Sequence, residues 1–421
     1  MPVSPAPAAG LVDALREALA FEALGDPVGN LTVGRGTLGA RAVRVALVEN
    51  RAASGSLGTR ESERLGALFR IAASERAGLV LFLDSAGAKV SEGLVALGAF
   101  RSLYRAGLDA VLAGVPIAAV LGKNCYGGAS MLAHLAGWRL FGATTQLAMS
   151  GPSIIASAAG VNVLDEMFRA MAEAALSAAA RAKASPANAV WTPESGLGAW
   201  LRDALAPRAD PVAALHLRHE GLVMRFEKKI SEPEWGPLQR RDLDRIYKQE
   251  YQVRESQGFF TGQGRREGAV EEIVGLFGKA PLGAQRAWRF ADAVWRHVES
   301  PPERLEVFLD CATHAASLDD EKIVLTEYIA DMGFALAALA SKGTRVGLTI
   351  LGKAGGGVYV ALAAPVHRVA SVYGADIQVL PGAAVAAILG ESRETTPGFD
   401  EYRAAHVSEE EIKLGLVPGK K

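Results

Sequence analysis

The stretch VPIAAVLGKNCYGGASM, residues 115–131, runs from an apolar segment of strand length into two adjacent glycines at the start of an expected helix. A second stretch, TRVGLTILGKAGGGVYVALA, residues 344–363, repeats the same order, including Gly-Lys before the glycines. An apolar strand that turns into a helix through a glycine corner is typical of α/β proteins. The chain therefore carries the same structural device twice.

A wider comparison of the two halves supports an internal repeat. The segment GLVLFLDSAGA at 78–88 corresponds to RLEVFLDCATH at 304–314. Asp310 follows Asp84 by 226 residues, and Lys353 follows Lys123 by 230, so the offset is nearly constant. A period of this length is too long for a solenoid and indicates two homologous domains. We place them at residues 1–250 and 251–421.

Apolar runs of strand length alternate with segments of helical period, which favours an α/β fold with βα crossovers. The expected strands are 42–50, 77–85 (with Asp84 as the last strand residue) and 115–121, and the expected helices are 59–77, 91–112 and one that opens near Gly128. Proline, tryptophan and alternating charge at 186–260 indicate a loop followed by solvated helices.

The composition limits the class of protein. A chain of 421 residues with 50% hydrophobic residues fits two globular domains, and a net charge of −1 offers no general attraction for nucleic acid or an anionic membrane. Two cysteines are too few for a disulfide framework or a cysteine-rich zinc site, so we expect no metal and a reducing compartment. The N-terminus does not resemble a signal peptide, and no apolar run spans a membrane. We therefore expect a cytoplasmic protein.

The glycine corners suggest a specific chemistry. A Gly-Gly pair at a helix start leaves backbone N–H groups exposed, and the helix dipole adds partial positive charge there. Two such N–H groups, one from each of two converging loops, form an oxyanion hole. Such a hole stabilises the enolate that forms when a thioester loses a proton or a carboxylate at its α-carbon. In both halves a loop of small residues follows a strand-ending aspartate and can supply the second N–H.

The first half also resembles a known family. The segments 33–65, 81–94 and 147–160 are similar to the carboxyltransferase subunits of acyl-CoA carboxylases and of malonate decarboxylase, and the second half resembles their partner domain more weakly. The resemblance implies two crotonase-like domains (ββα spiral) in tandem, with the active site between an N-type and a C-type half. It also implies an acyl thioester substrate, carried by coenzyme A or an acyl carrier protein.

The resemblance assigns roles to particular residues. It implies a first oxyanion hole and a second one with catalytic roles for Gly87, Ala88, Gly127, Gly128, Gly356 and Gly357, with Ala312 or Thr313 completing the second hole. It implies substrate-binding roles for Ser85, Lys89, Ala312, Thr313, Ser150 and Gly151. Among these, Lys89 is expected to help hold a coenzyme A phosphate, and Ser150-Gly151 matches the malonate decarboxylase version of its loop.

The chain departs from the family in ways that bear on the reaction. It has no four-cysteine zinc ribbon, and the loop after Asp310 lacks the Pro-Gly-Phe sequence of most biotin-dependent members. These departures favour decarboxylation of a malonyl thioester without biotin and with no covalently bound cofactor. Carboxyl transfer between carboxybiotin and an acyl-CoA stays open, as does a non-catalytic scaffold that docks a carrier protein. Further decarboxylase or carboxylase subunits and a homo-oligomer are the expected assembly partners.

Several reactive side chains have alternative interpretations. Ser130 occupies a loop similar to that of the ClpP-type serine peptidases, but a nucleophilic serine needs a positioned histidine, and only His134 lies nearby in sequence. We therefore expect Ser130 to be a bystander. Cys125 and Cys311 are expected to be small buried residues. His314 is either a proton donor or acceptor near the second hole or a solvated loop histidine.

Overall fold

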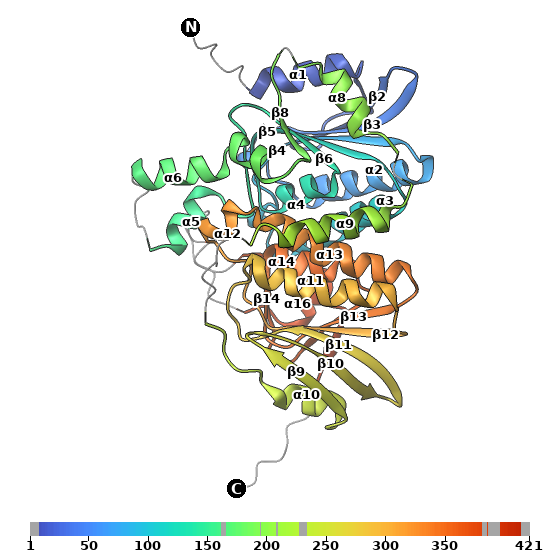
Figure 1. Cartoon of the computed structure of the whole chain (residues 1–421), viewed down its shortest axis with the longest axis vertical. Helices are drawn as coiled ribbons and strands as arrows, with labels where there is room; N and C mark the ends of the chain where they lie inside the picture. Colours follow the sequence, from blue (N-terminus) through green and yellow to red (C-terminus); the bar gives the residue numbers. More distant parts are fainter. Residues whose placement is uncertain are drawn as a thin grey trace.

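The computed structural model describes residues 8–160, 166–193, 195–207, 209–226, 234–380, 385 and 396–413. Two sheets lie at opposite ends of the molecule, and two layers of helices fill the space between them (Figure 1). The order of the layers is therefore sheet, helices, helices, sheet. Within the described residues, no helix combines the length and the apolar character that crossing a membrane requires.

The first sheet is built from residues of the first half. Its hydrogen-bonded order is β1-β2-β3-β4-β5-β6-β8, and β7 pairs with β5. The β2–β3 hairpin is antiparallel, and the strands from β3 onward pair in parallel. The bounds are β1 Glu22–Ala23, β2 Leu31–Leu38, β3 Arg41–Val48, β4 Gly78–Ser85, β5 Ile117–Tyr126, β6 Trp138–Phe141, β7 Gln146–Ala148 and β8 Asn188–Val190.

The second sheet repeats this topology. Its order is β17-β15-β13-β12-β11-β10-β9, again with an antiparallel hairpin (β10–β11) followed by parallel strands, and β14 pairs with β16. The expected tandem of two α/β units is confirmed. The bounds are β9 Tyr251–Ser256, β10 Phe259–Arg266, β11 Ala269–Leu276, β12 Arg304–Leu309, β13 Arg345–Ile350, β14 Lys353–Gly355, β15 Arg368–Val372, β16 Asp376–Gln378 and β17 Glu410–Ile412.

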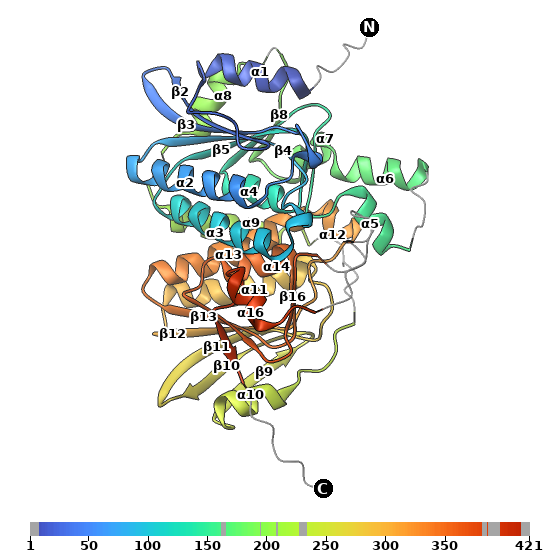
Figure 2. The same cartoon turned by 180° about the vertical axis from the view of Figure 1, so that it is seen from behind.

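The inner helices follow corresponding strands in the two units. They are α2 (Thr59–Glu75), α3 (Gly93–Leu112) and α4 (Gly128–Leu135) in the first and α11 (Ala284–Glu299), α13 (Leu325–Ser341) and α14 (Gly356–Ala363) in the second. Helix α13 is apolar or small on nearly every face, and a helix with that pattern is buried on all sides. It packs on α3 and α4 as well as on α11 and α14, and α14 also contacts α3 (Figure 2). These contacts join the two units.

Other helices cover the outer faces and the edges. Helices α1 (Ala8–Ala18) and α8 (Leu197–Ala204) bury an apolar cluster on the outer face of the first sheet, and α10 (Arg240–Tyr247) does so on the second. Helix α9 (Pro211–Val223) packs on α11 and α13. The remaining helices are η1 Ala53–Gly55, η2 Val90–Glu92, α5 Pro152–Ala158, α6 Glu166–Leu176, α7 Ala178–Ala184, α12 Leu318–Lys322 and α16 Phe399–Ala404.

Three details correct the sequence analysis. Strand β4 ends at Ser85, the end of the expected range 77–85, so Asp84 is not its last residue. Strand β5 continues to Tyr126, since Asn124, Cys125 and Tyr126 pair with β7 and extend the ladder into the stretch expected as a loop. Helices α8 and α9, expected to be solvated, each bury an apolar face. Residues 227–233, in the same expected segment, lie outside the described residues.

Candidate active site

A cavity of about 290 Å³ lies between the two units, and both glycine corners open into it. Gly127 and Gly128 line it from the first unit, and Gly356 and Gly357 line it from the second. The other lining residues are mostly apolar: Ala86, Ala88, Val90, Leu97, Phe100, Tyr126, Met131, Met149, Gly151, Ile154, Ser157, Ala158, Pro281, Thr313, His314, Ala316, Val360, Val379 and Leu380. The two corners therefore face a single chamber.

The first corner offers the backbone N–H of Gly128. Gly127 has a φ of 54°, and its own N–H is 3.2 Å from the carbonyl oxygens of both Ala148 and Met149. Gly128 is the first residue of α4, so its N–H has no acceptor inside the helix. A Cβ on Gly87, whose φ is 95°, would lie 2.7 Å from the nitrogen of Gly128. Gly87 and Gly127 therefore set the backbone conformation of the corner, and Gly128 supplies the available N–H group.

A second available N–H group in the first corner is that of the Ala88 backbone. The N–H of Leu57 donates to the carbonyl of Gly87 (2.8 Å), and the N–H of Lys89 donates back to the carbonyl of Leu57 (2.9 Å). In this parallel bridge the N–H of Ala88 points away from Leu57, and Ala88 lines the cavity. The N–H of Gly87, by contrast, donates to Ser85 Oγ at 3.0 Å. Ala88 and Gly128 are therefore the pair of available N–H groups.

The second corner reproduces this hydrogen-bond pattern. Leu282 N–H donates to the carbonyl of Thr313 (2.7 Å), and Ala315 N–H donates to the carbonyl of Leu282 (2.8 Å). Gly356 has a φ of 53°, as Gly127 has in the first corner. The position equivalent to Ala88 is therefore His314. Thr313 lines the cavity as well, whereas Ala312 is not among its lining residues.

An aspartate at the end of a strand fastens the two loops of each corner. Asp84 Oδ1 accepts the N–H of Asn124 at 3.0 Å, and Asp310 Oδ1 accepts the N–H of Lys353 at 2.8 Å. Burial raises the pKa of both carboxyl groups, while these N–H donors and the nearby lysines oppose the rise. The aspartates at the strand ends, which first indicated the repeat, thus hold each corner together.

The other expected substrate-binding residues take different positions. Gly151 lines the cavity. Ser85 is fully buried, and its hydroxyl accepts the N–H of Gly87, so it supports the loop. Lys89 is partly exposed, and its Nζ lies 3.1 Å from Glu92 Oε1. Ser150 is fully buried and is not one of the lining residues.

The structure brings together Ser150 and His314, which the sequence analysis named for unrelated reasons. Ser150 Oγ lies 3.0 Å from His314 Nε2, and His314 Nδ1 lies 3.2 Å from Thr313 Oγ1. The N–H of Ser150 donates to Glu321 Oε1 at 2.8 Å. Burial lowers the pKa of His314 to about 4 and raises the pKa of Glu321 to about 7. The imidazole is therefore neutral when the cavity holds no charge, and it is not a solvated loop histidine.

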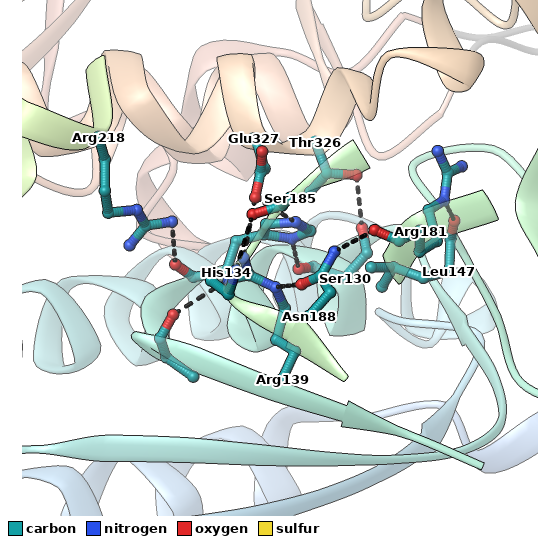
Figure 3. Close-up of polar contacts among 12 residues, drawn as sticks. Ser130, His134, Arg139, Leu147, Arg181, Ser185, Asn188, Arg218, Thr326 and Glu327 are labelled. Carbon is teal, nitrogen blue, oxygen red and sulfur yellow. Dashed lines mark hydrogen bonds and ion pairs between the residues drawn. The ribbon is translucent and has the colours of Figure 1, made fainter. Parts of the chain in front are cut away.

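Ser130 and His134 do not form a nucleophilic pair. Ser130 Oγ donates to the carbonyl of Gly127 at 2.7 Å and lies 3.1 Å from Thr326 Oγ1 (Figure 3). His134 Nδ1 contacts the backbone carbonyl of Ser130, not its hydroxyl. Burial, helped by the charge of Arg139, lowers the pKa of His134 well below its ordinary value. Both side chains are fully buried, so they belong to the packing between the units.

The two cysteines are buried, and neither lines the cavity. Burial raises the pKa of the Cys125 thiol, and it raises the pKa of the Cys311 thiol to about 12. In the part of the chain that the structure describes, no three histidine, cysteine, aspartate or glutamate side chains are grouped so that they could hold a metal ion.

Comparisons with known proteins agree with the resemblance seen in the sequence. Residues 12–174 match the carboxyl transferase domain family. Over 153 residues the chain is 29% identical to the methylmalonyl-CoA carboxyltransferase 12S subunit of Propionibacterium freudenreichii subsp. shermanii. The matched segment covers 36% of this chain and 29% of that protein. The chain thus matches less than a third of the length of this relative.

Two solved structures are also similar. A transcarboxylase 12S structure with methylmalonyl-coenzyme A and methylmalonic acid bound is 18% identical, has a TM-score of 0.39, and covers 96% of this chain and 86% of that chain. A chain of a Pseudomonas malonate decarboxylase hetero-tetramer in complex with malonate is 21% identical, has a TM-score of 0.45, and covers 55% of this chain and 95% of that chain.

Proposed function

We propose that this chain, whose residues 12–174 match the carboxyl transferase domain family, is an enzyme that decarboxylates a malonyl thioester through an enolate. One observation carries the proposal: two glycine corners of the same build face one mostly apolar cavity between the units. The thioester would be carried by coenzyme A or by an acyl carrier protein. Its acyl group would enter the cavity between the two units.

The first corner is suited to the thioester carbonyl. Its oxygen would accept the N–H groups of Ala88 and Gly128, which come from two different loops and converge on the cavity. When carbon dioxide leaves, negative charge moves onto this oxygen, where the two donors and the start of α4 stabilise it. Removing one donor of this kind typically costs about 2.7–4 kcal/mol of transition-state stabilisation.

The lining of the cavity favours loss of carbon dioxide. Among the lining residues that the structure describes, none is a lysine, arginine, aspartate or glutamate. A malonyl carboxylate that enters this chamber loses much of its hydration without gaining a lysine or arginine counter-ion from these residues. Its charge is stabilised better after the electron pair has moved to the thioester oxygen, so the chamber favours the transition state over the ground state.

The carrier and the assembly follow from the same proposal. Lys89 lies beside the first corner on the partly exposed side of its loop, so it can reach the phosphates of coenzyme A once it leaves Glu92. We further propose a homo-oligomer, or a complex with other decarboxylase or carboxylase subunits. Met224 and Leu217, at 71% and 69% exposure, leave apolar surface uncovered on and just after α9, and this supports assembly.

A second candidate is carboxyl transfer between carboxybiotin and an acyl-CoA. The 29% identity with the methylmalonyl-CoA carboxyltransferase 12S subunit favours it. In this case the biotin would arrive on another protein, and the second corner, with the N–H groups of His314 and Gly357, would receive its ureido oxygen. His314 and Gly357 both line the cavity, so their N–H groups would donate to this oxygen, as those of Ala88 and Gly128 would donate to the oxygen in the first corner.

One experiment separates the candidates. Purified protein is incubated with malonyl-CoA or a malonyl carrier protein, with and without avidin, and release of carbon dioxide is followed. Release that avidin does not affect supports decarboxylation, and transfer that avidin blocks supports the biotin-dependent reaction. No turnover with either thioester would leave the carrier-docking scaffold.

A variant tests the assignment of the first corner. A Cβ at residue 128 would lie 2.5 Å from the ring of Phe100, so Gly128→Val should close the corner and abolish activity. Gly221→Val is the matched control, because a Cβ at Gly221, on helix α9, meets no atom within 4 Å. Full activity of a folded Gly128→Val protein would contradict the oxyanion-hole assignment.

A further inference from the structure

The two corners differ in one side chain. The position of Ala88 in the first corner is occupied by His314 in the second, with the same backbone hydrogen bonds on either side. A methyl group has thus been replaced by an imidazole at the wall of the cavity. We propose that His314, held by Ser150 of the other unit, delivers the proton to the α-carbon of the thioester. This inference rests on the proposed enolate chemistry.

The other described side chains that line the cavity offer no comparable proton donor. Within the described part of the lining, four residues carry a side-chain O–H or N–H: Tyr126, Ser157, Thr313 and His314. The hydroxyl of Tyr126 donates to Gln146, and burial raises the pKa of this tyrosine well above its ordinary value. Serine and threonine hydroxyls do not ionise near neutral pH. Among these described lining side chains, His314 is therefore the one whose ordinary pKa lies near neutrality.

The imidazole is oriented from both sides. Ser150 Oγ holds Nε2 at 3.0 Å, and Thr313 Oγ1 lies 3.2 Å from Nδ1. The Ser150 backbone is itself fixed by Glu321, whose Oε2 lies 3.5 Å from Arg181 Nη2. These two charged groups stand behind Ser150, and burial is the cause that lowers the pKa of His314. Nδ1 is thus left on the side of the second corner, toward Gly356.

The proton balance of the reaction fits this placement. The carbon–carbon bond to the carboxylate breaks, carbon dioxide leaves, and the electron pair passes into the enolate. The α-carbon then takes the Nδ1 proton of the imidazolium form of His314, and the ring becomes neutral with Nε2–H still donated to Ser150 Oγ. The described lining supplies no other charged side chain, so a substrate anion favours protonation of the ring, and the proton enters from solvent when the substrate binds.

Ser150 acts by positioning, not as a nucleophile. Its side chain is fully buried, and the residue does not line the cavity, so a bound thioester does not reach its hydroxyl. What the serine provides is a hydrogen bond that crosses from the loop before α5 to the loop after β12. The catalytic group of the pair is His314, which does reach the chamber.

The half-reaction that needs only proton transfer gives a direct test. The protein is incubated with acetyl-CoA in D₂O, and deuterium incorporation at the acetyl methyl group is measured by mass spectrometry. We expect wild-type protein to exchange, and His314→Gln to exchange about 100-fold more slowly or worse, as expected on loss of an acid–base group. Ser150→Ala should lower the maximal exchange rate about tenfold with an unchanged KM, because the ring is present but not held.

Controls keep this test independent of folding and of the decarboxylation proposal. His367→Gln changes a histidine outside the cavity and should exchange at the wild-type rate, and thermal unfolding is followed for every variant. Release of carbon dioxide from malonyl-CoA is measured in parallel. Exchange that survives in His314→Gln overturns the inference even if decarboxylation is observed, as does wild-type decarboxylation without any exchange. Wild-type exchange without carbon dioxide release overturns only the decarboxylation, and absence of both overturns both.

Discussion

Arg139 Nη2 and Glu327 Oε1 lie 2.9 Å apart at the boundary between the two units, and both side chains are almost completely buried (Figure 3). Arg225 contacts the other carboxylate oxygen of Glu327. Burial by itself raises the pKa of Glu327, but the charges of Arg225 and Arg139 outweigh it and lower that pKa to about 2. A buried ion cluster therefore fastens β6 of the first unit to α13 of the second.

Removal of the carboxylate charge from this cluster should lower the free energy of unfolding. Glu327→Gln leaves two arginines without their counter-ion, and breaking a buried pair in this way typically costs about 3–5 kcal/mol. Urea unfolding measures the change. Glu22→Gln is the control, since Glu22 pairs with Arg35 on the surface at about 60% exposure and should change stability far less than Glu327→Gln does. Equal losses in the two variants would contradict the assignment of Glu327 to the joint.

A buried histidine predicts a loss of stability in alkali. His219 Nδ1 lies 2.7 Å from Asp331 Oδ2, and its Nε2 lies 3.7 Å from Asp292 Oδ1. Burial alone would lower the pKa of His219, but the two carboxylates raise it to about 9. Because the folded pKa lies above the unfolded value of about 6.5, the stabilisation is complete below pH 6.5 and is lost as the pH rises through 9.

The measurement is the free energy of unfolding of wild-type and His219→Gln protein between pH 6 and pH 10. The difference between the two should be largest at the acid end and should shrink toward pH 9 and above. A difference that stays constant over this range would show that His219 does not bind its proton more tightly in the folded protein.

Local pattern was enough to predict several elements of the first unit. Strand β4 and helix α2 were expected within two residues of their bounds, because period-2 and period-3.6 hydrophobicity are properties of adjacent residues. The near-constant offset from Asp84 to Asp310 predicted the repeat, and the two aspartates play the same role in the structure. The glycine corners were found for the same reason, since each is a short contiguous motif.

Contacts between the units could not be predicted from local pattern. Ser150 and His314 are 164 residues apart, and their hydrogen bond depends on how the two units pack. From the sequence alone, His314 was equally well interpreted as a solvated loop histidine or as a proton donor or acceptor. The one signal that pointed to it was its alignment with Ala88 in the repeat, but the alignment shows the position and not the partner. The length of β5 was missed because its last residues pair with β7, a strand of three residues.

The thiols should resist alkylation in the folded protein. Cys125 and Cys311 are fully buried, and burial raises the pKa of both thiols, so little thiolate exists near neutral pH and reagent cannot reach it. Native protein treated with iodoacetamide at pH 7.5 should keep its mass, and protein in 8 M urea should gain two adducts. Rapid labelling of either cysteine in native protein would mean that its loop opens to solvent.

The absence of a side chain at Gly87 leaves the N–H of Gly128 uncovered in the proposed first oxyanion hole. Gly87 has a φ of 95°, and a Cβ there would lie 2.7 Å from the nitrogen of Gly128 and 2.9 Å from the carbonyl oxygen of Tyr126. In Gly87→Ala the methyl group should cover the N–H of Gly128. Loss of one such donor lowers kcat by about 10²–10³, so release of carbon dioxide from malonyl-CoA should fall by this factor.

Gly39→Ala separates backbone strain from loss of the donor. Gly39 also has a positive φ, 63°, but a Cβ there meets no atom within 4 Å. Gly39→Ala should lose about 1 kcal/mol of stability, because alanine is strained at positive φ. Gly87→Ala should lose more, because its Cβ also lies 2.7 and 2.9 Å from backbone atoms. Only Gly87→Ala should lose activity. If the two variants kept equal activity, the N–H of Gly128 would not be the donor to the thioester. The Gly39 hairpin lies between β2 and β3, away from the residues that line the cavity. If both variants lost activity equally, backbone strain and not a covered N–H group would therefore be the cause.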